Sequence, residues 1–392
     1  MKRHQRKNAT ARIPPPDWQI RRFVLPPILQ AERRGRAWLE RLLPRAGERL
    51  VIPVHAADNH AWAPVLARLA HACGATAELL LLDGAAPDPA SATMLDVCRR
   101  LGIPVKTSSP EAVAKAEATG VLFGHGRWRM PLPDTNTAAW DVAWPGNDDS
   151  AEGMLHRADA LSPMLPCAEV RALDERAIRD YGLPGLCLME QAGIGATAVA
   201  KRMLEQRGVK PYSSRYALII AGGGNNGGDA LVVARGLMEM DYRVRLAVAT
   251  APERSSPDAR ANWDILAGGG LPLPQRGPTE PEELADALAS VAPGADLIVD
   301  GLLGTGAKGE PRGPVREAIR MIRLAHEDGV PVLSLDLPSG LDGDSGQAAE
   351  MAVRATATVT FAAVKPGLLK GDGPTHAGEL YLADIGIGPQ LA

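Results

Sequence analysis

The stretch "IIAGGGNNGGDALVVARG", from Ile219 to Gly236, decides how the chain folds. It starts with an apolar run, continues with glycines, two asparagines and an aspartate, and ends with apolar residues at helical spacing. This order predicts a buried strand, a tight loop and a helix, the opening unit of an α/β sheet. Glycine lets the backbone approach a ligand and adopt positive φ, and a helix N-terminus offers unpaired N–H groups to an anion. The loop is therefore predicted to contact phosphate.

Strand-like and helical segments alternate from about Tyr216 onward, and two more helices are predicted just upstream. Apolar strands separated by helices are typical of a parallel sheet that is covered on both faces. Residues 161–392 are therefore predicted to form one doubly wound, mainly parallel α/β domain. The expected strands are "YALIIA", "RVRLAVAT", "DLIVDG", "PVLSLDLPSG" and "TATVTFA", and the upstream helices are "CAEVRALDERAIRDYG" and "GLCLMEQAGIGATAVAKRMLEQRG".

Residues 21–160 are predicted to form a smaller, degenerate α/β region that repeats part of this pattern. The segment "VIPVHAADNHAWAPVLARLAHACGATAELLLLD" aligns without a gap on "LIIAGGGNNGGDALVVARGLMEMDYRVRLAVAT". We interpret the match as a decayed internal duplication, although any two βαβ units share some of this rhythm. The aligned identities are Asn59 with Asn226, Val65 with Val232, Ala67 with Ala234, Arg68 with Arg235 and Leu79 with Leu246.

The glycine-rich loop is not kept in the first copy. There the loop reads "AADNHAW", with Trp62 in the place of Asp229. An indole and Cβ atoms stand where backbone has to approach phosphate, so residues 21–160 are expected to be inert. We expect this region to pack on the C-terminal domain as a built-in partner, in place of a second subunit; a site for another ligand is the alternative. Residues 1–20 are basic and are expected to form a disordered tail.

Composition excludes several classes of protein. A formal net charge of -3 argues against a dedicated nucleic-acid binder, and 45% hydrophobic with 23% charged residues is typical of a soluble globular chain. No apolar stretch approaches the roughly 20 residues that span a bilayer, so no membrane association is expected.

The cysteines are widely spaced and form no CxxC pair, which favours free thiols in a reducing cytoplasm. They are Cys73, Cys98, Cys167 and Cys187.

The glycine loop also matches the dinucleotide fingerprint G-x-G-x-x-G, through Gly222, Gly224 and Gly227. The usual acidic residue at the end of the second strand is missing, because that strand ends "LAVAT" and Glu253 lies in the following loop. A nicotinamide-dependent oxidoreductase is therefore disfavoured. The order Asn-Asn-Gly-Gly-Asp offers amide and carboxylate oxygens, as a cation paired with phosphate requires.

Four motifs and their order resemble the NAD(P)H-hydrate epimerase family, the YjeF N-terminal domain, over residues 161–392. They are "GGGNNGGDALVVARGL", "DLIVDGLLGTGAKGEPRGP", "PVLSLDLPSGLDGDSG" and "TVTFAAVKPGLL", preceded by "LMEQAG". The resemblance implies a Rossmann-like domain, usually a homodimer, that binds potassium. With the N-terminal region as a built-in partner, we expect either such a homodimer or an intramolecular pseudo-dimer. It implies a substrate, NAD(P)HX, which is NADH or NADPH hydrated at C6. The family interconverts the R and S epimers, and a separate dehydratase acts on S.

The family's functional residues carry over to matching positions of this chain. The resemblance implies catalytic roles for Asp336 and Lys365. Potassium ligands are expected at Asn226, Asp300 and Ser339. Substrate contacts are expected from two loops and one carboxylate: Asn225, Asn226, Gly227, Gly228, Asp229, Gly304, Thr305, Gly306, Ala307, Lys308, Gly309, Glu310 and Asp336.

Inversion at C6 needs no redox step. It needs removal and return of a proton, either as the ring opens or as the hydroxyl leaves and re-adds, and a positioned Asp336 suits this task. Other roles stay open from sequence alone: Asp336 and Asp300 also suit turn caps, and Lys365 also suits an ordinary surface position. Asp342 and "LDGDSG" suit either a cation or a turn. A non-catalytic nucleotide- or protein-binding scaffold with this fold is the alternative function.

Overall fold

The computed structural model describes residues 25–42, 49–54, 62–82, 87–109, 122–123, 126–127, 155–157, 162–269 and 281–387. These residues form two compact units. The C-terminal unit holds Val199–Thr360 and Lys365–Leu380, and the N-terminal unit holds Val24–Ala198, Phe361–Val364 and Tyr381–Ala392. The predicted tail, residues 1–20, and the predicted border at residues 160 and 161 lie outside the described residues.

A seven-stranded, mainly parallel sheet confirms the predicted α/β fold. β12 and β6, at one edge of this sheet, form an antiparallel pair. In sheet order the strands are β6 (Leu155–Arg157), β12 (Glu379–Ala383), β11 (Ala357–Phe361), β10 (Val332–Leu335), β9 (Leu297–Gly301), β7 (Tyr216–Ala221) and β8 (Arg243–Val248).

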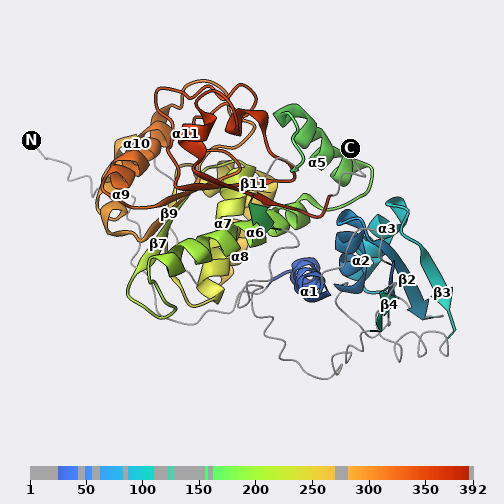
Figure 1. Ribbon diagram of the computed structural model, residues 1–392. Helices are drawn as coiled ribbons and strands as arrows, with labels where there is room; N and C mark the ends of the chain where they lie inside the picture. Colours follow the sequence, from blue (N-terminus) through green and yellow to red (C-terminus); the bar gives the residue numbers. More distant parts are fainter. Residues whose placement is uncertain are drawn as a thin grey trace, which may run out of the picture. The chain divides into compact units, whose positions relative to one another are not determined.

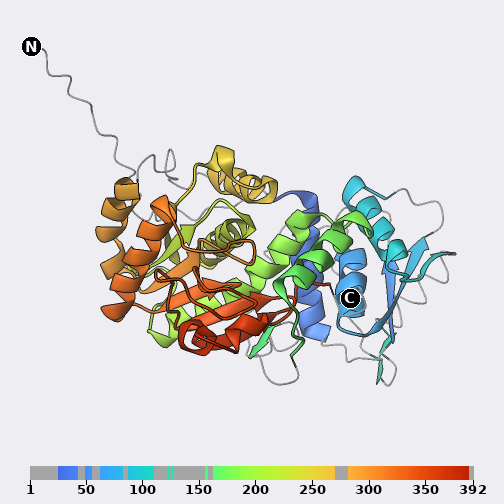
Figure 2. The same ribbon diagram turned by 90° about the horizontal axis from the view of Figure 1, so that it is seen from above.

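Helices cover both faces of the sheet in the C-terminal unit, as doubly wound folds require (Figure 1). Leu218 and Ile220 of β7 pack in one apolar core with α9 and α10. Successive strand residues point to opposite faces, so buried Ile219 faces α7 instead. Seen from above, α9 and α10 lie side by side (Figure 2). The helices are α7 (Asn225–Glu239), α8 (Pro257–Gly268), α9 (Pro281–Ala289), α10 (Gly313–Glu327) and α11 (Gly373–Ala377), with 3-10 turns η2 (Pro252–Arg254), η3 (Ala292–Gly294) and η4 (Pro366–Leu368).

The order of the strands reverses at β7, which fixes where a ligand binds. After β7 the chain adds β8 on one side and then returns to add β9 on the other side. Helices that follow β7 and β9 leave on opposite faces, so a crevice opens between the carboxyl ends of these two strands. The glycine loop follows β7 and the segment 302–310 follows β9, so both predicted loops lie at this switch point.

The N-terminal unit contains a separate three-stranded parallel sheet in the order β1-β2-β3. Its elements are α1 (Pro27–Leu42), β1 (Arg49–Val54), α2 (Trp62–Ala72), β2 (Thr76–Leu82), α3 (Pro89–Arg100), β3 (Val105–Ser108), the hairpin β4 (Leu122–Phe123) and β5 (Gly126–Arg127), α5 (Cys167–Arg179) and most of α6 (Gly185–Gln206). None of the helices in the described residues has the length and apolarity to cross a membrane.

The two units share one frame from β1 to α3. The offset that places Arg49 on Tyr216 also places the start of β2 on the start of β8, and the two strand pairs have the same register. The frames diverge after α3, because β3 pairs with β2 whereas β9 pairs with β7. A duplication predicts the shared part of this frame, and the duplication itself stays a prediction.

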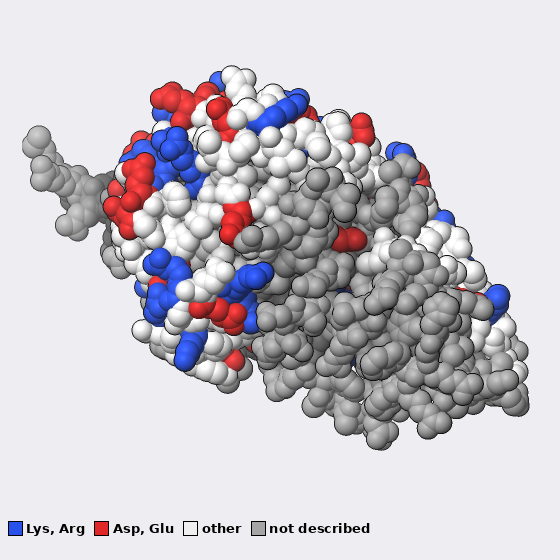
Figure 3. Space-filling view, in the orientation of Figure 1, with Lys and Arg blue, Asp and Glu red and all other residues white. Residues whose placement is uncertain are grey.

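Charges of both signs are interspersed on the described surface in Figure 3. Over α9 and α10, for example, Glu282 and Glu283 follow the start of one helix, and Arg320 pairs with Glu317 on the other. A mixed surface of this kind keeps a protein soluble without creating a large field of one sign.

Candidate active site

The candidate site lies in the C-terminal unit, where the loops after β7, β9, β10 and β11 meet. Carboxyl ends of parallel strands lie at one edge of a sheet, which is where open α/β sheets bind ligands. Each of these loops contains polar residues, and hydrogen bonds and an ion pair connect residues of different loops.

Two glycines of the loop after β7 are fixed by packing within the protein. A Cβ at Gly222 would lie 2.1 Å from the carbonyl oxygen of Leu302, and a Cβ at Gly227 would lie 2.0 Å from the carbonyl oxygen of Gly222. No glycine from Gly222 to Gly228 has a positive φ. Close approach of the strand, the loop and the helix, and not positive φ, therefore explains glycine at Gly222 and Gly227.

Gly224 and Asn225 form the open side of this loop. Gly224 is the N-cap of α7, and a Cβ placed on it would meet no atom within 4 Å. Asn225 is exposed, whereas Asn226 and Asp229 in the same turn are 7% and 8% exposed. The first turn of α7 thus offers backbone N–H groups at an accessible helix N-terminus, where an anion is stabilised.

Asp300 is a fully buried carboxylate at the end of β9. Its oxygens accept hydrogen bonds from the Ser339 hydroxyl (2.6 Å), the Ser339 amide (3.0 Å) and the Ser334 hydroxyl (2.9 Å). Burial raises the pKa of Asp300, although these hydrogen bonds lower it. All of these partners are neutral, so none of them balances the negative charge of an ionised Asp300 carboxylate. A bound cation would balance it.

Asn226 connects this carboxylate to the glycine loop. Its Nδ2 donates to the carbonyl oxygen of Leu303 (2.8 Å), and the Leu303 amide donates to the Ser339 hydroxyl (3.0 Å). Its buried Oδ1 accepts no hydrogen bond from the described residues. An amide oxygen without a donor, a hydroxyl and a buried carboxylate are hard oxygen ligands, the kind that alkali and alkaline-earth cations take in proteins.

Asp336 and Lys365 form a buried ion pair at the ends of β10 and β11. Lys365 Nζ donates to Asp336 Oδ1 (2.6 Å) and to the Thr360 hydroxyl (3.1 Å), and Lys365 is only 1% exposed. The other oxygen, Asp336 Oδ2, accepts from the Thr305 amide (3.2 Å). The surface role for Lys365 is therefore wrong, and Asp336 is held by distant loops instead of capping its own turn.

The backbone at Asp336 adopts an uncommon conformation. Its φ is +64°, and the Leu337 amide donates to the carbonyl oxygen of Leu335 (2.7 Å), which closes a three-residue turn. Asp is one of the few residues that tolerate this left-handed region. Ala362, just after β11, repeats the pattern with φ +62°. Such strained turns are found where surrounding structure fixes a functional side chain.

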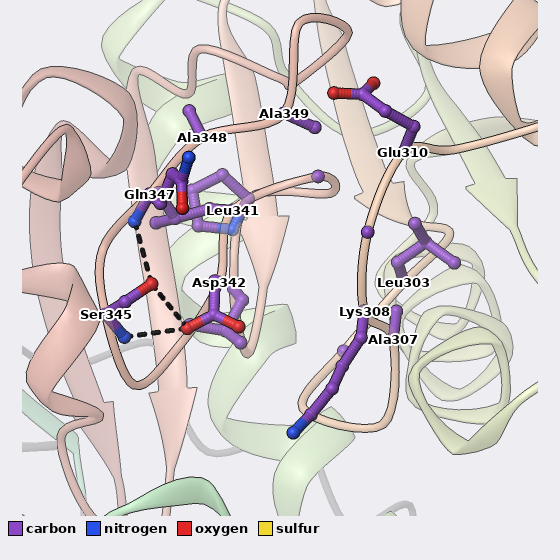
Figure 4. Close-up of a pocket in the computed structure, with 15 residues that line it drawn as sticks. Leu303, Ala307, Lys308, Glu310, Leu341, Asp342, Ser345, Gln347, Ala348 and Ala349 are labelled. Atoms are coloured by element: carbon purple, nitrogen blue, oxygen red, sulfur yellow. Dashed lines mark hydrogen bonds between the residues drawn. The ribbon is translucent and has the colours of Figure 1, made fainter.

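A cavity of about 240 Å³ lies between the segments that follow β9 and β10 (Figure 4). Its lining includes Gly304 and Leu337, which neighbour Asp336. Lys308 and Glu310 come from one wall, and Asp342 and Ser345 come from the other. Asp342 Oδ1 accepts from the amide (2.7 Å) and hydroxyl (2.8 Å) of Ser345, contacts that lower the pKa of Asp342. These contacts belong to a local turn, so turn chemistry accounts for Asp342 without a cation.

The predicted residues fall into one connected site and a more exposed rim. Asn226, Asp300, Ser339, Asp336 and Lys365 all join the network through the loop after β9. Gly304 lies at its centre, because a Cβ there would be 3.2 Å from Asp336 Oδ2 and 3.3 Å from Asn226 Cβ. Exposed residues of the same loop line the cavity instead of contacting Asp336: Lys308, Gly309 and Glu310.

Sequence reasoning missed two residues of the network, Ser334 and Thr360. Both are completely buried, in β10 and β11, where they contact Asp300 and Lys365. A hydroxyl in the middle of an apolar strand needs a hydrogen-bond partner when it is buried. Polar residues within "VLSL" and "TVTF" were therefore the available signal.

The known proteins that resemble this chain match the part of it that contains the candidate site. The model of the family "YjeF-related protein N-terminus" matches residues 185–367. An "NAD(P)H-hydrate epimerase" from Pirellula staleyi is 41% identical over 219 residues, which are 55% of this chain and 89% of that protein. A protein of the same name from Rhodopirellula baltica is 33% identical over 230 residues, 58% of this chain and 86% of that protein.

Other relatives are longer proteins, and this chain matches only part of their length. The "Bifunctional NAD(P)H-hydrate repair enzyme Nnr" from Salinibacter ruber is 39% identical over 239 residues, 59% of this chain. The match spans 42% of that relative's length. The solved structure titled "Crystal structure of yeast ynu0, YNL200c" aligns with a TM-score of 0.47 and 22% identity, over 56% of this chain and 86% of that chain.

Proposed function

The chain belongs to the family of YjeF-related N-terminal proteins, and from this we propose that it interconverts the R and S forms of C6-hydrated NADH or NADPH. Relatives that the chain covers to 89% and 86% carry the name NAD(P)H-hydrate epimerase. The observation that carries the proposal is the buried pair of Asp336 and Lys365 beside an open helix N-terminus.

Asp336 is the proposed general acid and base. Along the ring-opening route its carboxylate takes the proton of the C6 hydroxyl. The N1–C6 bond breaks with its electron pair moving to N1, an aldehyde forms at C6, and Asp336 passes the proton to N1. Rotation and reclosure of the ring on the other face return the proton. Along the second route the protonated hydroxyl leaves as water and water re-adds on the opposite face. Both routes need one group that accepts a proton and gives it back, with no oxidant or reductant.

Lys365 positions this carboxylate. Its ammonium group is 2.6 Å from Asp336 Oδ1 and is itself fixed by the Thr360 hydroxyl, so the carboxylate has one defined orientation. The Thr305 amide fixes the second oxygen from the neighbouring loop. A pre-organised acid–base group of this kind loses little free energy to reorganisation during the reaction.

The phosphates of the substrate are proposed to bind at the first turn of α7. Gly224 and Asn225 are open there, and backbone N–H groups stabilise anions at such a position. Asn226, Asp300 and Ser339 would hold potassium, which supplies positive charge beside the phosphates. Support comes from the Asn226 oxygen without a donor and the neutral surroundings of Asp300. The cavity beside Asp336 is the space proposed for the adjoining part of the dinucleotide.

We infer that a dehydratase consumes the S form, because epimerisation alone leaves the cofactor hydrated. The name of the longer relatives, bifunctional repair enzyme, supports such a coupling. We also propose that the protein works in the cytoplasm. All four of its cysteines are free, and three of them are buried, which suits a reducing compartment.

The proposal is tested by chromatography of the two epimers. Purified protein is supplied with R-NADHX that has been freed of S, in the presence of potassium, and the appearance of S is followed. A blank without protein is essential because the epimers also interconvert unaided. We expect acceleration over the blank, and we expect an Asp336→Asn variant to lose it. Exchange at the rate of the blank, with the substrate still bound, would contradict the epimerase and leave a binding scaffold.

A further inference from the structure

Helix α1 carries charged side chains into the interior of the N-terminal unit. Glu32 is 0% exposed and Arg36 is 1% exposed. Burial raises the pKa of Glu32, against the effect of the Arg68 charge. Charged groups are seldom buried to this extent unless other groups are arranged to meet them. The hydrogen-bond partners of these side chains therefore identify the surface against which α1 packs.

Helix α6 supplies partners for three residues of α1. Gln191 donates through Nε2 to Glu32 Oε2 (2.8 Å) and accepts at Oε1 from Arg36 Nη1 (3.0 Å). Glu190 accepts at Oε1 from Arg33 Nε (2.7 Å). Both α6 residues are 0% exposed. Helix α1 thus covers the polar residues Glu190 and Gln191 of α6, which lie in the motif "LMEQAG".

Helix α2 joins the same contact through Arg68. Its Nη2 donates to Glu32 Oε2 (2.5 Å), and its Nη1 donates to the carbonyl oxygen of Gly386 (2.8 Å). Gly386 has a φ of +77°, and a Cβ there would lie 2.4 Å from Arg68 Nη1 and 2.6 Å from Leu69 Cδ2. The segment after β12 therefore fits against α2 so closely that it leaves no room for a side chain.

One side of this interface lies within the family match and the other lies outside it. Glu190 and Gln191 fall inside residues 185–367, whereas α1 and α2 precede them. The Pirellula staleyi relative is covered to 89% by a match of 219 residues, which leaves no space for a region as long as residues 1–160. That relative therefore has no counterpart of the whole region that contributes α1 and α2 to this interface.

Helix α1 is also the counterpart of α6 in sequence and in position. Residues 30–43, "QAERRGRAWLERLL", align on residues 191–204, "QAGIGATAVAKRML", with Gln, Ala, Ala, Arg and Leu recurring at the same spacing. Along the chain α1 directly precedes β1, and α6 directly precedes β7. A helix that packs on its own counterpart is the arrangement found where two copies of one domain meet about a two-fold axis.

From these contacts we propose that α1 and α2 are an in-chain partner which occupies the face of α6 that a second copy of the chain would otherwise use. Glu190 and Gln191 form the centre of this face, and their partners come from the same chain. The protein is then a monomer whose association surface is already filled. This inference goes beyond the proposed reaction and does not depend on it.

Charge reversal in the full-length chain tests the proposal. Arg33→Glu and Glu190→Arg each place like charges or unpaired charges in the interface, and the double variant restores one opposite pair. Arg179→Glu is the matched control, because Arg179 belongs to an ion pair on α5 and its side chain is 70% exposed. Mass is measured by light scattering over a range of concentrations, together with the protease resistance of the N-terminal unit.

We expect a monomer for the wild type and for Arg179→Glu. Arg33→Glu leaves the α6 face unchanged and is expected to associate with rising concentration and to be cut faster. Glu190→Arg alters that face, so it is expected to be cut faster without associating. The double variant is expected to return to a protease-resistant monomer. A wild-type dimer would overturn the proposal. So would single variants that match the control in both measurements. If a single variant unfolds, recovery in the double variant supports the pairing, and failure to recover contradicts it.

Discussion

The strand–helix pair of β1 and α2 and the pair of β7 and α7 share a frame but differ in what lies between strand and helix. Their strands pair with β2 and β8 in the same register. Arg68 and Arg235 occupy equivalent positions and are 1% and 0% exposed. Trp62 takes the position of Asp229, and both side chains are nearly buried. The frame is thus kept while the polar residues at the strand end are exchanged.

The two buried arginines occupy equivalent positions of the shared frame but have different partners. Arg235 donates to Asn262 of α8 (3.1 Å), within its own sheet layer. Arg68 donates to Glu32 and to the Gly386 carbonyl instead. A buried guanidinium has to be met by acceptors, and at these two equivalent positions the acceptors come from different elements.

The largest effect is expected at the site that only the C-terminal unit has. Asp336→Asn removes the proton acceptor, and Asn tolerates the same positive φ, so the turn is preserved. We expect the R-to-S rate to fall by about 10²- to 10⁴-fold, the usual contribution of general acid–base catalysis. Substrate affinity, measured by calorimetry, is expected to change by only a few-fold. Retention of the full rate would remove Asp336 from the mechanism.

A matched pair of substitutions separates packing from chemistry at the two equivalent positions. Trp62→Ala is expected to lower the free energy of unfolding by about 3–5 kcal/mol, since a buried aromatic side chain is lost, without changing kcat of the folded protein. Asp229→Ala is expected to weaken substrate binding by about 10- to 100-fold, with a smaller loss of stability. Denaturant titration and calorimetry on both variants give the comparison. Weaker binding in Trp62→Ala would show that the first copy still takes part in the site.

A smaller effect is expected from Thr360, which fixes Lys365. Thr360→Val keeps the shape of the side chain but removes one hydrogen bond, worth about 0.5–1.5 kcal/mol. We expect kcat to fall by about 3- to 10-fold while KM is unchanged. Thr360→Ser keeps the hydroxyl and serves as control. Equal losses in both variants would point to packing of β11 and would argue against positioning of Lys365.

The smallest effect concerns the turn that forms the cavity wall. Contacts with Ser345 lower the pKa of Asp342 below its ordinary value of 3.8. A lowered pKa in the folded state means that the carboxylate stabilises the fold above pH 3.8 and that this contribution is lost as pH falls through the folded pKa. The difference in melting temperature between wild type and Asp342→Asn is therefore expected to shrink on acidification. A constant difference would show that the turn does not depend on the charge.

Sequence periodicity predicts the strands and the edge of the sheet where the site lies. It does so because β7, β9, β10 and β11 are each buried on both faces and read as apolar runs. The topology of the sheet then brings together the polar residues near the ends of those runs. The placement of Asn226, Asp300 and Asp336 at one edge of the sheet is therefore predictable from the sequence.

Contacts between distant segments are not visible in local patterns. The glycines at Gly222 and Gly227 indicate a crowded loop, but only the fold shows that the crowding comes from Leu302 and from the loop itself. Thr360 reaches Lys365, and Glu32 reaches Gln191 across 159 residues. Which buried polar group meets which partner depends on how elements pack, and spacing along the chain does not specify it.

The number of hydrated cofactors bound per chain tests the contrast between the two units most directly. An equilibrated mixture of R- and S-NADPHX, which undergoes no net reaction, is titrated calorimetrically into the wild-type protein and the Asp229→Ala variant. A single site per chain that is weakened in the variant is the predicted result, with the site carried by the C-terminal unit. A second site that persists in Asp229→Ala would contradict the account, because the N-terminal unit would then bind the ligand without the glycine loop.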